Sequence, residues 1–412
     1  MDCFVPGRVL LAPQEFGIAD MEGRLAEELG LPFSIEFDVG EIIERYPERR
    51  RFTERRPSKS FPLPVVGRVP EGAEQDAAAR LSSLKMIDAA CPDYRVDLSA
   101  AMTINTMAIN HAVKEIDALP VSQSCGGRAV VGILDSGVDA GVLNDPGRLF
   151  GVQFDVTDPY DHGGPPTDPV GHGTLVAAII QSLAPAAELV SIRISGGTSS
   201  LSGAVAGLYL AAENDCNIIN MSFSVSCDIR RCGVCKTPSG STTSVPQMAY
   251  FFDLFRRANP DCVLIAAAGN RAGYREPPVA MPAVFSGVIA VGQSNDTGTG
   301  AAANSLYGEV PTDRYVLAPG GSRDLADAIA TIQPYRKAEA LFGTSFSAAF
   351  ASGVASRYVC GYYGGECGGS GTGGLSLPDH VLQQMTKAAD RGWPDFRPDL
   401  HGIGTLRYHY AP

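Results

Sequence analysis

Long apolar runs alternate with amphipathic segments along the last three quarters of the chain. Residues 128–134 (RAVVGIL) and 262–268 (CVLIAAA) are almost continuously apolar. Such runs are typical of strands that are buried on both faces, as in parallel sheets covered by helices. Small and apolar residues after positions 172 and 345 predict helices that pack closely in the interior. We therefore predict an α/β domain with a doubly wound, mostly parallel sheet.

The first hundred residues show a different pattern, in which short strands and one-sided helices follow each other. The pattern predicts strands at 8–13, 33–39, 65–69 and 94–98, and helices at 18–29 and 71–84. This β-α-β-β-α-β order is that of a small α+β ferredoxin-like domain. Pro92 and the segment Ser99–Thr103 are the predicted boundary, so we expect one domain over residues 1–100 and a second over 101–412.

The composition is that of a folded protein. Of the 412 residues, 45% are hydrophobic and 19% are charged, which suffices for a large core and excludes a disordered chain. The 33 Lys and Arg against 45 Asp and Glu give a net charge of −12, which argues against nucleic acid as a partner. The basic residues Arg49–Arg51, Arg55 and Arg56 are expected on a solvated loop.

Location and membrane contact are predicted from the lack of long apolar segments. No stretch approaches the roughly 18 apolar residues of a membrane span, so no membrane association is expected. The first twenty residues have no basic segment followed by an apolar run, and we therefore predict a cytoplasmic protein. Export by a non-standard route is the alternative.

Ten cysteines leave several possibilities open. Cys227, Cys232 and Cys235 could bind zinc with a fourth ligand, form a disulfide or remain free thiols. Cys360 and Cys367 flank a short loop that they could close. Because no second Cys-x-x-Cys pair completes a four-ligand site, we predict neither a metal nor a cofactor.

Four polar residues stand where predicted buried elements begin or end. Asp135 follows the first apolar run, at the end of a strand, where α/β proteins place site residues. His172 lies between two glycines at the start of an apolar helix, and Asn270 follows the second apolar run. Ser345 opens a helix, whose dipole and amides would stabilise negative charge near its oxygen. Taken singly, each has a plainer role as a cap, a turn residue or a core side chain.

Together, these residues resemble the subtilisin-like serine peptidases, in which they recur in the same order. The motifs that carry the resemblance are DSGVD, GHGT, NMSFS, AAAGN, APG and GTSFSA, within residues 105–412. The resemblance implies that Ser345 is the nucleophile, that His172 acts as base and then acid, and that Asp135 orients the imidazole. Asn270 and the Ser345 backbone N–H would form the oxyanion hole.

The resemblance also implies that an extended peptide adds a strand to two exposed edges. The residues implied to bind substrate are Gly197, Thr198, Ser199, Ser222, Phe223 and Ser224 on the edges, Ala267, Ala268 and Gly269 in the wall of the specificity pocket, and Ala280 near its base. Because the pocket residues are small and uncharged, we expect an apolar residue before the scissile bond. Pro282 stands where the family has a cis proline.

The sequence departs from the family pattern at several positions. Leu175 stands where the family commonly has histidine after His-Gly-Thr, and Ala349 stands where it usually has proline. Phe223 and Ser224 replace the usual Leu-Gly of the second edge. The calcium-binding loop that many members carry after the histidine helix is missing, so we predict no calcium site.

The first hundred residues resemble the inhibitory prodomain of the family, whose tail lies in the substrate groove. We therefore expect the chain to be its own inhibitor, with processing near residues 98–106. A permanently retained accessory domain is the alternative. The overall prediction is a serine endopeptidase that acts on peptides or proteins through an acyl-enzyme. The alternatives are a maturation peptidase or acyl-transferring enzyme for one precursor, and a non-catalytic scaffold.

Overall fold

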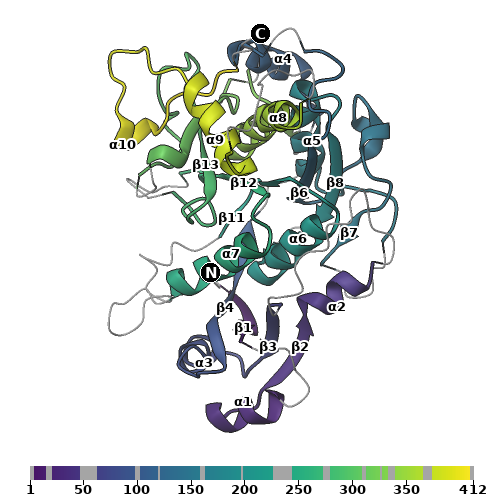
Figure 1. Ribbon diagram of the computed structural model, residues 1–412, viewed down its shortest axis with the longest axis vertical. Helices are drawn as coiled ribbons and strands as arrows, with labels where there is room; N and C mark the ends of the chain where they lie inside the picture. The colour runs from purple at the N-terminus through teal and green to yellow at the C-terminus, as the bar shows by residue number, and fades with distance from the viewer. Residues whose placement is uncertain are drawn as a thin grey trace.

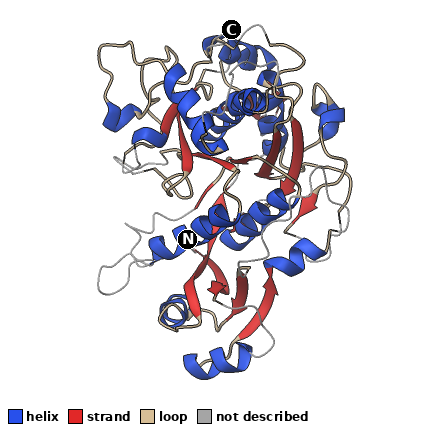
Figure 2. Cartoon of the chain, viewed as in Figure 1, coloured by secondary structure: helices blue, strands red, loops and turns tan. Residues whose placement is uncertain are grey.

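The computed structural model has a small N-terminal unit joined to a larger α/β unit (Figure 1). It describes residues 4–14, 21–46, 63–97, 103–118, 121–157, 163–195, 198–225, 244–271, 279–308, 312–324, 327–332, 339–364 and 374–408. Helices cover both faces of the larger sheet, and the smaller sheet also carries helices of its own (Figure 2). No helix within these ranges is both long and apolar enough to cross a membrane.

The N-terminal unit is the predicted α+β fold. Its strands are β1 (Phe4–Pro13), β2 (Ser34–Asp38), β3 (Val65–Arg68) and β4 (Ile87–Asp97), and its helices are α1 (Met21–Leu29), α2 (Val39–Glu44) and α3 (Glu74–Leu81). The strands pair antiparallel in the order β4-β1-β3-β2. This is the strand order that a β-α-β-β-α-β chain gives when its two halves interleave.

Three details of this unit differ from the sequence prediction. The last strand, predicted at 94–98, already begins at Ile87. The helix α2 was not predicted, although Asp38 and Glu41 form a reciprocal capping box at its start. Pro92 does not mark a boundary, because it lies inside β4 opposite Val9. The pairing of β1 with β4 is irregular next to Pro92, and such irregularities tolerate a residue without an N–H.

The strand β1 is buried on both faces, which explains its continuous apolar run. Val9 and Leu11 pack toward α1 and α3. Leu10 and Ala12 belong instead to a cluster that includes side chains of the larger unit. The two units therefore share one apolar core, in which α6 (Leu201–Glu213) and α7 (Ser244–Ala258) lie against β4 (Figure 1).

The larger unit is built on a seven-stranded parallel sheet, as predicted. Its order is β14 (Tyr315–Ala318), β13 (Val288–Gln293), β12 (Val263–Ala267), β10 (Ile218–Met221), β6 (Val130–Asp135), β8 (Glu188–Arg193) and β7 (Phe154–Asp155). The helices α5 (His172–Leu183) and α8 (Thr344–Tyr362) pack together on one face, and α6 and α7 cover the other.

Shorter elements complete the described fold. They are β5 (Thr103–Ile104), β15 (Ala330–Ile332) and β16 (Glu339–Leu341) in a small sheet, β9 (Thr198–Ser200) and β11 (Ser224–Val225) beside β4, the helices α4 (Thr106–Glu115), α9 (Leu377–Ala388) and α10 (Pro398–His401), and the 3₁₀ turns η1 (Ala140–Val142), η2 (Pro146–Arg148) and η3 (Thr312–Arg314). The Met281–Pro282 peptide bond is cis, as the resemblance implies.

Candidate active site

Asp135 and His172 meet at the carboxyl end of the central strand β6. His172 Nδ1 lies 2.8 Å from Asp135 Oδ1 and 2.9 Å from Oδ2. The two residues are 0% and 1% exposed, so water screens the pair little. The Ser136 N–H also donates to Asp135 Oδ1, at 2.8 Å. The carboxylate is therefore fixed from two sides and can hold the imidazole with its proton on Nδ1.

The surroundings of His172 favour its protonated form. Burial lowers the pKa of His172, but the charge of Asp135, the hydrogen bond to it and the charge of Asp168 together raise the pKa above its ordinary value. The imidazolium that forms when His172 accepts a proton is thus stabilised where it stands. A histidine in this setting is suited to general-base work near neutral pH.

Close backbone contacts leave no room for larger residues around this pair. A Cβ on Gly173, the residue after His172, would lie 2.1 Å from the Gly137 carbonyl oxygen. A Cβ on Gly137, whose φ is +112°, would lie 2.1 Å from the Thr167 carbonyl oxygen. The GHGT and DSGVD motifs need their glycines because the start of α5 and two loops are packed backbone to backbone.

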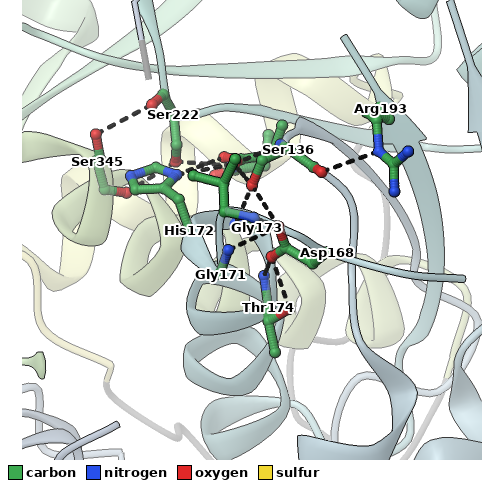
Figure 3. Close-up of polar contacts among 12 residues, drawn as sticks. Ser136, Asp168, Gly171, His172, Gly173, Thr174, Arg193, Ser222 and Ser345 are labelled. Carbon is green, nitrogen blue, oxygen red and sulfur yellow. Dashed lines mark hydrogen bonds and ion pairs between the residues drawn. The ribbon is translucent and has the colours of Figure 1, made fainter. Parts of the chain in front are cut away.

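Ser345 lies at the first turn of α8 and is half-buried. Its hydroxyl donates to the Ser222 carbonyl oxygen at 3.0 Å, and the Ser222 hydroxyl donates to the Ser345 carbonyl oxygen at 2.8 Å (Figure 3). The neighbouring Phe346 ring is centred 5.6 Å from the His172 ring, which places the start of α8 beside the imidazole. Within the described residues, no hydrogen bond joins Ser345 to His172.

The Asn270 side chain is exposed and is oriented by the residue before Ser345. Asn270 Oδ1 accepts hydrogen bonds from the Thr344 N–H at 3.0 Å and from the Thr344 hydroxyl at 3.3 Å. A Cβ on Gly343 would lie 2.8 Å from Asn270 Nδ2. The amide group therefore stands at the N-terminus of α8, with its Nδ2 donor close to Gly343, two residues before Ser345.

The residues implied to bind substrate differ in burial and in what they contact. Ala267 and Ala268 are buried at the end of β12, and the Ala280 N–H donates to the Ala268 carbonyl oxygen at 2.8 Å. Phe223 is 3% exposed within the core that the two units share. Ser222 contacts Ser345, whereas Gly197 lies outside the described residues.

The implied substrate edges flank the last strand of the N-terminal unit. β4 pairs antiparallel with β9, with Asp97 opposite Thr198 and Val96 opposite Ser199. On its other side it pairs antiparallel with β11, with Asp97 opposite Ser224. The strand therefore lies between the two edges that a bound peptide was expected to join.

The cysteine predictions cannot be placed in full. Cys227, Cys232 and Cys235 lie outside the described residues, as does Cys367, while Cys360 is buried in α8. Within the described parts of the chain, no group of three or more His, Cys, Asp or Glu side chains is arranged to hold a metal ion. The basic residues at 49–56 also lie outside the described ranges.

Sequence reasoning missed residues that hold the histidine helix. Ser136 and Asp168 accept hydrogen bonds from the first turn of α5, at Gly173 and Thr174. One signal was present: the residue before His172 is Gly171, which has no side chain to cap the helix. A helix start of this kind needs acceptors from elsewhere in the fold.

Comparison with known proteins decides the family. The model of the subtilase family (peptidase S8) matches residues 126–362, which is more than half of the chain. The chain belongs to the subtilase family. By this membership and by its likeness to subtilisin and other serine proteases, the chain is a serine-type endopeptidase.

Three relatives show how far the likeness extends. Subtilisin DY of Bacillus licheniformis is 28% identical over 251 residues, covering 58% of this chain and 78% of that protein. An intracellular serine protease of Paenibacillus polymyxa is 28% identical over 263 residues, covering 60% and 71%. The structure of fervidolysin from Fervidobacterium pennivorans matches 98% of this chain with a TM-score of 0.64 at 16% identity. The chain spans 60% of the fervidolysin chain, and this likeness shows the fold alone.

Proposed function

We propose that this subtilase hydrolyses peptide bonds with Ser345, His172 and Asp135 as its catalytic triad. The observation that carries the proposal is the buried Asp135–His172 pair, with Nδ1 to oxygen distances of 2.8 and 2.9 Å, beside the first turn of α8. In the first step, Ser345 Oγ attacks the substrate carbonyl carbon while His172 Nε2 accepts the hydroxyl proton. His172 then gives this proton to the leaving amine, and an acyl-enzyme remains.

Water completes the reaction by the same route. His172 takes a proton from water, the resulting oxygen attacks the acyl carbon, and the proton returns to Ser345 Oγ as the acid product leaves. Asp135 keeps its charge throughout and stabilises the imidazolium. For the first step, the Ser345 hydroxyl must turn away from the Ser222 carbonyl oxygen, which holds it at 3.0 Å.

The negative charge that develops on the substrate oxygen needs donors at the start of α8. Asn270 Nδ2 and the Ser345 N–H are the proposed donors, aided by the helix dipole. The two hydrogen bonds that Asn270 Oδ1 accepts from Thr344 support this assignment, because they fix the amide before substrate arrives.

We further propose that the N-terminal unit inhibits the enzyme in the same chain. The support is β4, which occupies the place of an added substrate strand between β9 and β11. Processing within residues 98–106 stays a prediction, and residues 98–102 lie outside the described ranges. Ser222, which contacts the nucleophile, precedes Ser224 by two residues. Since Ser224 pairs with Asp97, we expect self-cleavage two residues beyond Asp97, between Ser99 and Ala100. The residue before this bond is a small polar serine, so the apolar preference is a prediction for other substrates and not for this site.

Contacts away from the groove also support a docked inhibitor. The Asp93 carboxylate, 0% exposed, accepts hydrogen bonds from the Ser202 N–H at 2.9 Å and the Ser202 hydroxyl at 2.8 Å, at the start of α6. The Tyr46 hydroxyl donates to the Asp155 carbonyl oxygen and accepts from the Asp155 N–H, both at 2.9 Å. The N-terminal unit thereby continues the hydrogen bonding of the edge strand β7.

A peptide or protein substrate and the chain's own N-terminal unit are the proposed partners. The division at residue 100, the cytoplasmic location and an apolar preference before the scissile bond remain predictions of the sequence. Hydrolysis and acyl transfer are separated by the mass of the products, since a transferred acyl group is joined to an amine without addition of water.

Replacing Ser345 by alanine tests the proposal directly. We expect the purified wild-type chain to acquire a new N-terminus within residues 98–106 and to react with a fluorophosphonate probe. The Ser345→Ala variant should keep its full length and remain unlabelled, because no hydroxyl is left to attack. N-terminal sequencing and mass spectrometry measure both effects. Processing and labelling that persist in Ser345→Ala would exclude Ser345 as the nucleophile.

A further inference from the structure

Asp168 has no part in the reaction described above, yet it organises the start of the histidine helix. The first N–H groups of any helix lack partners within the helix, and in α5 the N-cap residue is Gly171, with φ +89° and no side chain. Acceptors come instead from two other loops. The Gly173 N–H donates to Ser136 Oγ at 3.1 Å, and the Thr174 N–H donates to Asp168 Oδ2 at 2.9 Å.

Both carboxylate oxygens of Asp168 are used. Oδ2 also accepts the Thr174 hydroxyl at 2.7 Å. Oδ1 accepts the N–H groups of Val170 at 3.1 Å and Gly171 at 2.8 Å, and the Ser136 hydroxyl at 2.9 Å. Asp168 therefore ties its own loop, the first turn of α5 and the residue after Asp135 to one rigid group (Figure 3).

Ser136 links this group to the catalytic pair. Its hydroxyl lies 2.9 Å from Asp168 Oδ1 and 3.2 Å from Asp135 Oδ1, and its N–H donates to Asp135 Oδ1 at 2.8 Å. Its carbonyl oxygen accepts a hydrogen bond from Arg193 Nε at 3.1 Å. A continuous set of contacts thus runs from His172 through Asp135 and Ser136 to Asp168.

Among the described residues, two carboxylates act on His172. Asp135 contacts the ring directly, and Asp168 acts on it from the loop before α5, each raising the pKa of His172. Arg193, on β8, reaches the group through the Ser136 carbonyl oxygen and is itself paired with Asp155 at 2.7 Å. From α8, the neighbour of the ring is the uncharged Phe346.

We propose that Asp168 is a positioning residue for peptide hydrolysis, which fixes the Asp135–His172 pair through Ser136 and the first turn of α5. The inference rests on the proposed triad and adds a residue to it. Its charge also favours the imidazolium, so that Asp168 acts on both the geometry and the proton affinity of the base.

The variant Asp168→Asn tests whether Asp168 acts on the geometry and the proton affinity of His172 or only on folding. The change removes the charge and turns one acceptor oxygen into a donor that faces N–H groups. In processed enzyme, we expect kcat per titrated active site to fall about 10- to 100-fold with little change in KM, because a misplaced base slows the chemical step. We expect the acid limb of kcat/KM to move to lower pH, since loss of the negative charge lowers the pKa of His172.

The pKa of His172 can also be measured in a variant that does not turn over substrate. In full-length chain that carries Ser345→Ala, the His172 ring is followed by NMR against pH. Asp168→Asn should lower the pKa of His172, and Asp168→Glu, which keeps the charge, should restore most of it. Asp145→Asn is the matched control: this exposed carboxylate caps the turn η2, and its loss should leave both the titration and kcat unchanged.

The outcomes distinguish a positioning role of Asp168 from a purely structural one. A merely structural Asp168 would lower the fraction of titratable active sites and leave the acid limb and the His172 titration in place, which would overturn the inference. Should Asp168→Asn fail to fold, Ser136→Ala breaks the link with the charge retained, and must lower kcat for the inference to stand. Full activity of Ser345→Ala would instead refute the proposed triad itself.

Discussion

The two halves of the proposed catalytic centre are built in different ways. Asp135 and His172 are almost completely buried, and the Ser136 N–H also holds the carboxylate. Ser345 is half-buried and Asn270 is exposed. The Ser345 hydroxyl is bonded to a carbonyl oxygen that it must leave before it can react.

This difference follows from what each half must do. The charged half has to stabilise an imidazolium, and a buried, fixed carboxylate does so without reorganisation during the reaction. The open half has to admit a peptide and allow the hydroxyl to rotate. Rigidity is thus concentrated where charge develops on the protein, and access is kept where the substrate arrives.

The largest effect is expected from breaking the buried half. Asp135→Asn leaves the size of the side chain unchanged but removes the charge that holds the Nδ1 proton, so the histidine presents the wrong tautomer to Ser345. We expect kcat to fall by about 10⁴-fold, with a similar loss in His172→Ala. Steady-state kinetics on active-site-normalised enzyme measures the loss, and an unchanged melting temperature shows an intact fold. Near-normal turnover in either variant would contradict the assigned roles.

A smaller effect is expected in the open half. Asn270→Ala removes the side-chain donor but leaves the Ser345 N–H, and should reduce kcat by about 10²- to 10³-fold with little change in KM. Asn259→Ala is the control, since this amide donates to the Phe255 carbonyl oxygen at the end of α7, away from the nucleophile loop. Equal kinetics in the two variants would remove Asn270 from the oxyanion hole.

The smallest effect is expected from weakening a contact between the N-terminal unit and the larger unit. Tyr46→Phe leaves the N–H and carbonyl of Asp155 without their buried partner, and we expect about tenfold weaker binding of the N-terminal unit. Activity should then appear sooner after processing. Tyr250→Phe, which loses an exposed hydrogen bond to Asp88, should change the onset less. If activity appeared sooner in Tyr250→Phe than in Tyr46→Phe, the Tyr46 contact would not be the one that holds the inhibitor.

Much of the fold and the proposed triad residues could be predicted from the sequence because their signals are local. A buried parallel strand is a continuous apolar run, and Asp135 and His172 stand directly at the ends of such elements. The motifs around them contain glycines that the close packing of Gly137 and Gly173 explains. The motifs and the family resemblance together predicted the pairing of Asp135 with His172, whereas the approach of Ser345 to His172 stays a prediction.

Features that depend on distant contacts were not predicted. The helix α2 is short, and Tyr46, which follows it, gains its role only from an edge strand 109 residues further on. The boundary predicted at Pro92 is wrong, because the irregular pairing that accommodates this proline depends on β1, about eighty residues earlier in the chain. Asp168 is proposed to act through Ser136, and no spacing in the sequence indicates that these two side chains are in contact.

The apolar core shared by the two units has a consequence for the timing of activity. Cutting one peptide bond after β4 leaves the contacts of Leu10 and Ala12 with the larger unit as they were. The severed piece would have to dissociate, and once free it could bind again. The onset of activity would therefore depend on dilution, and destruction of the free piece by an already active molecule would make the change permanent.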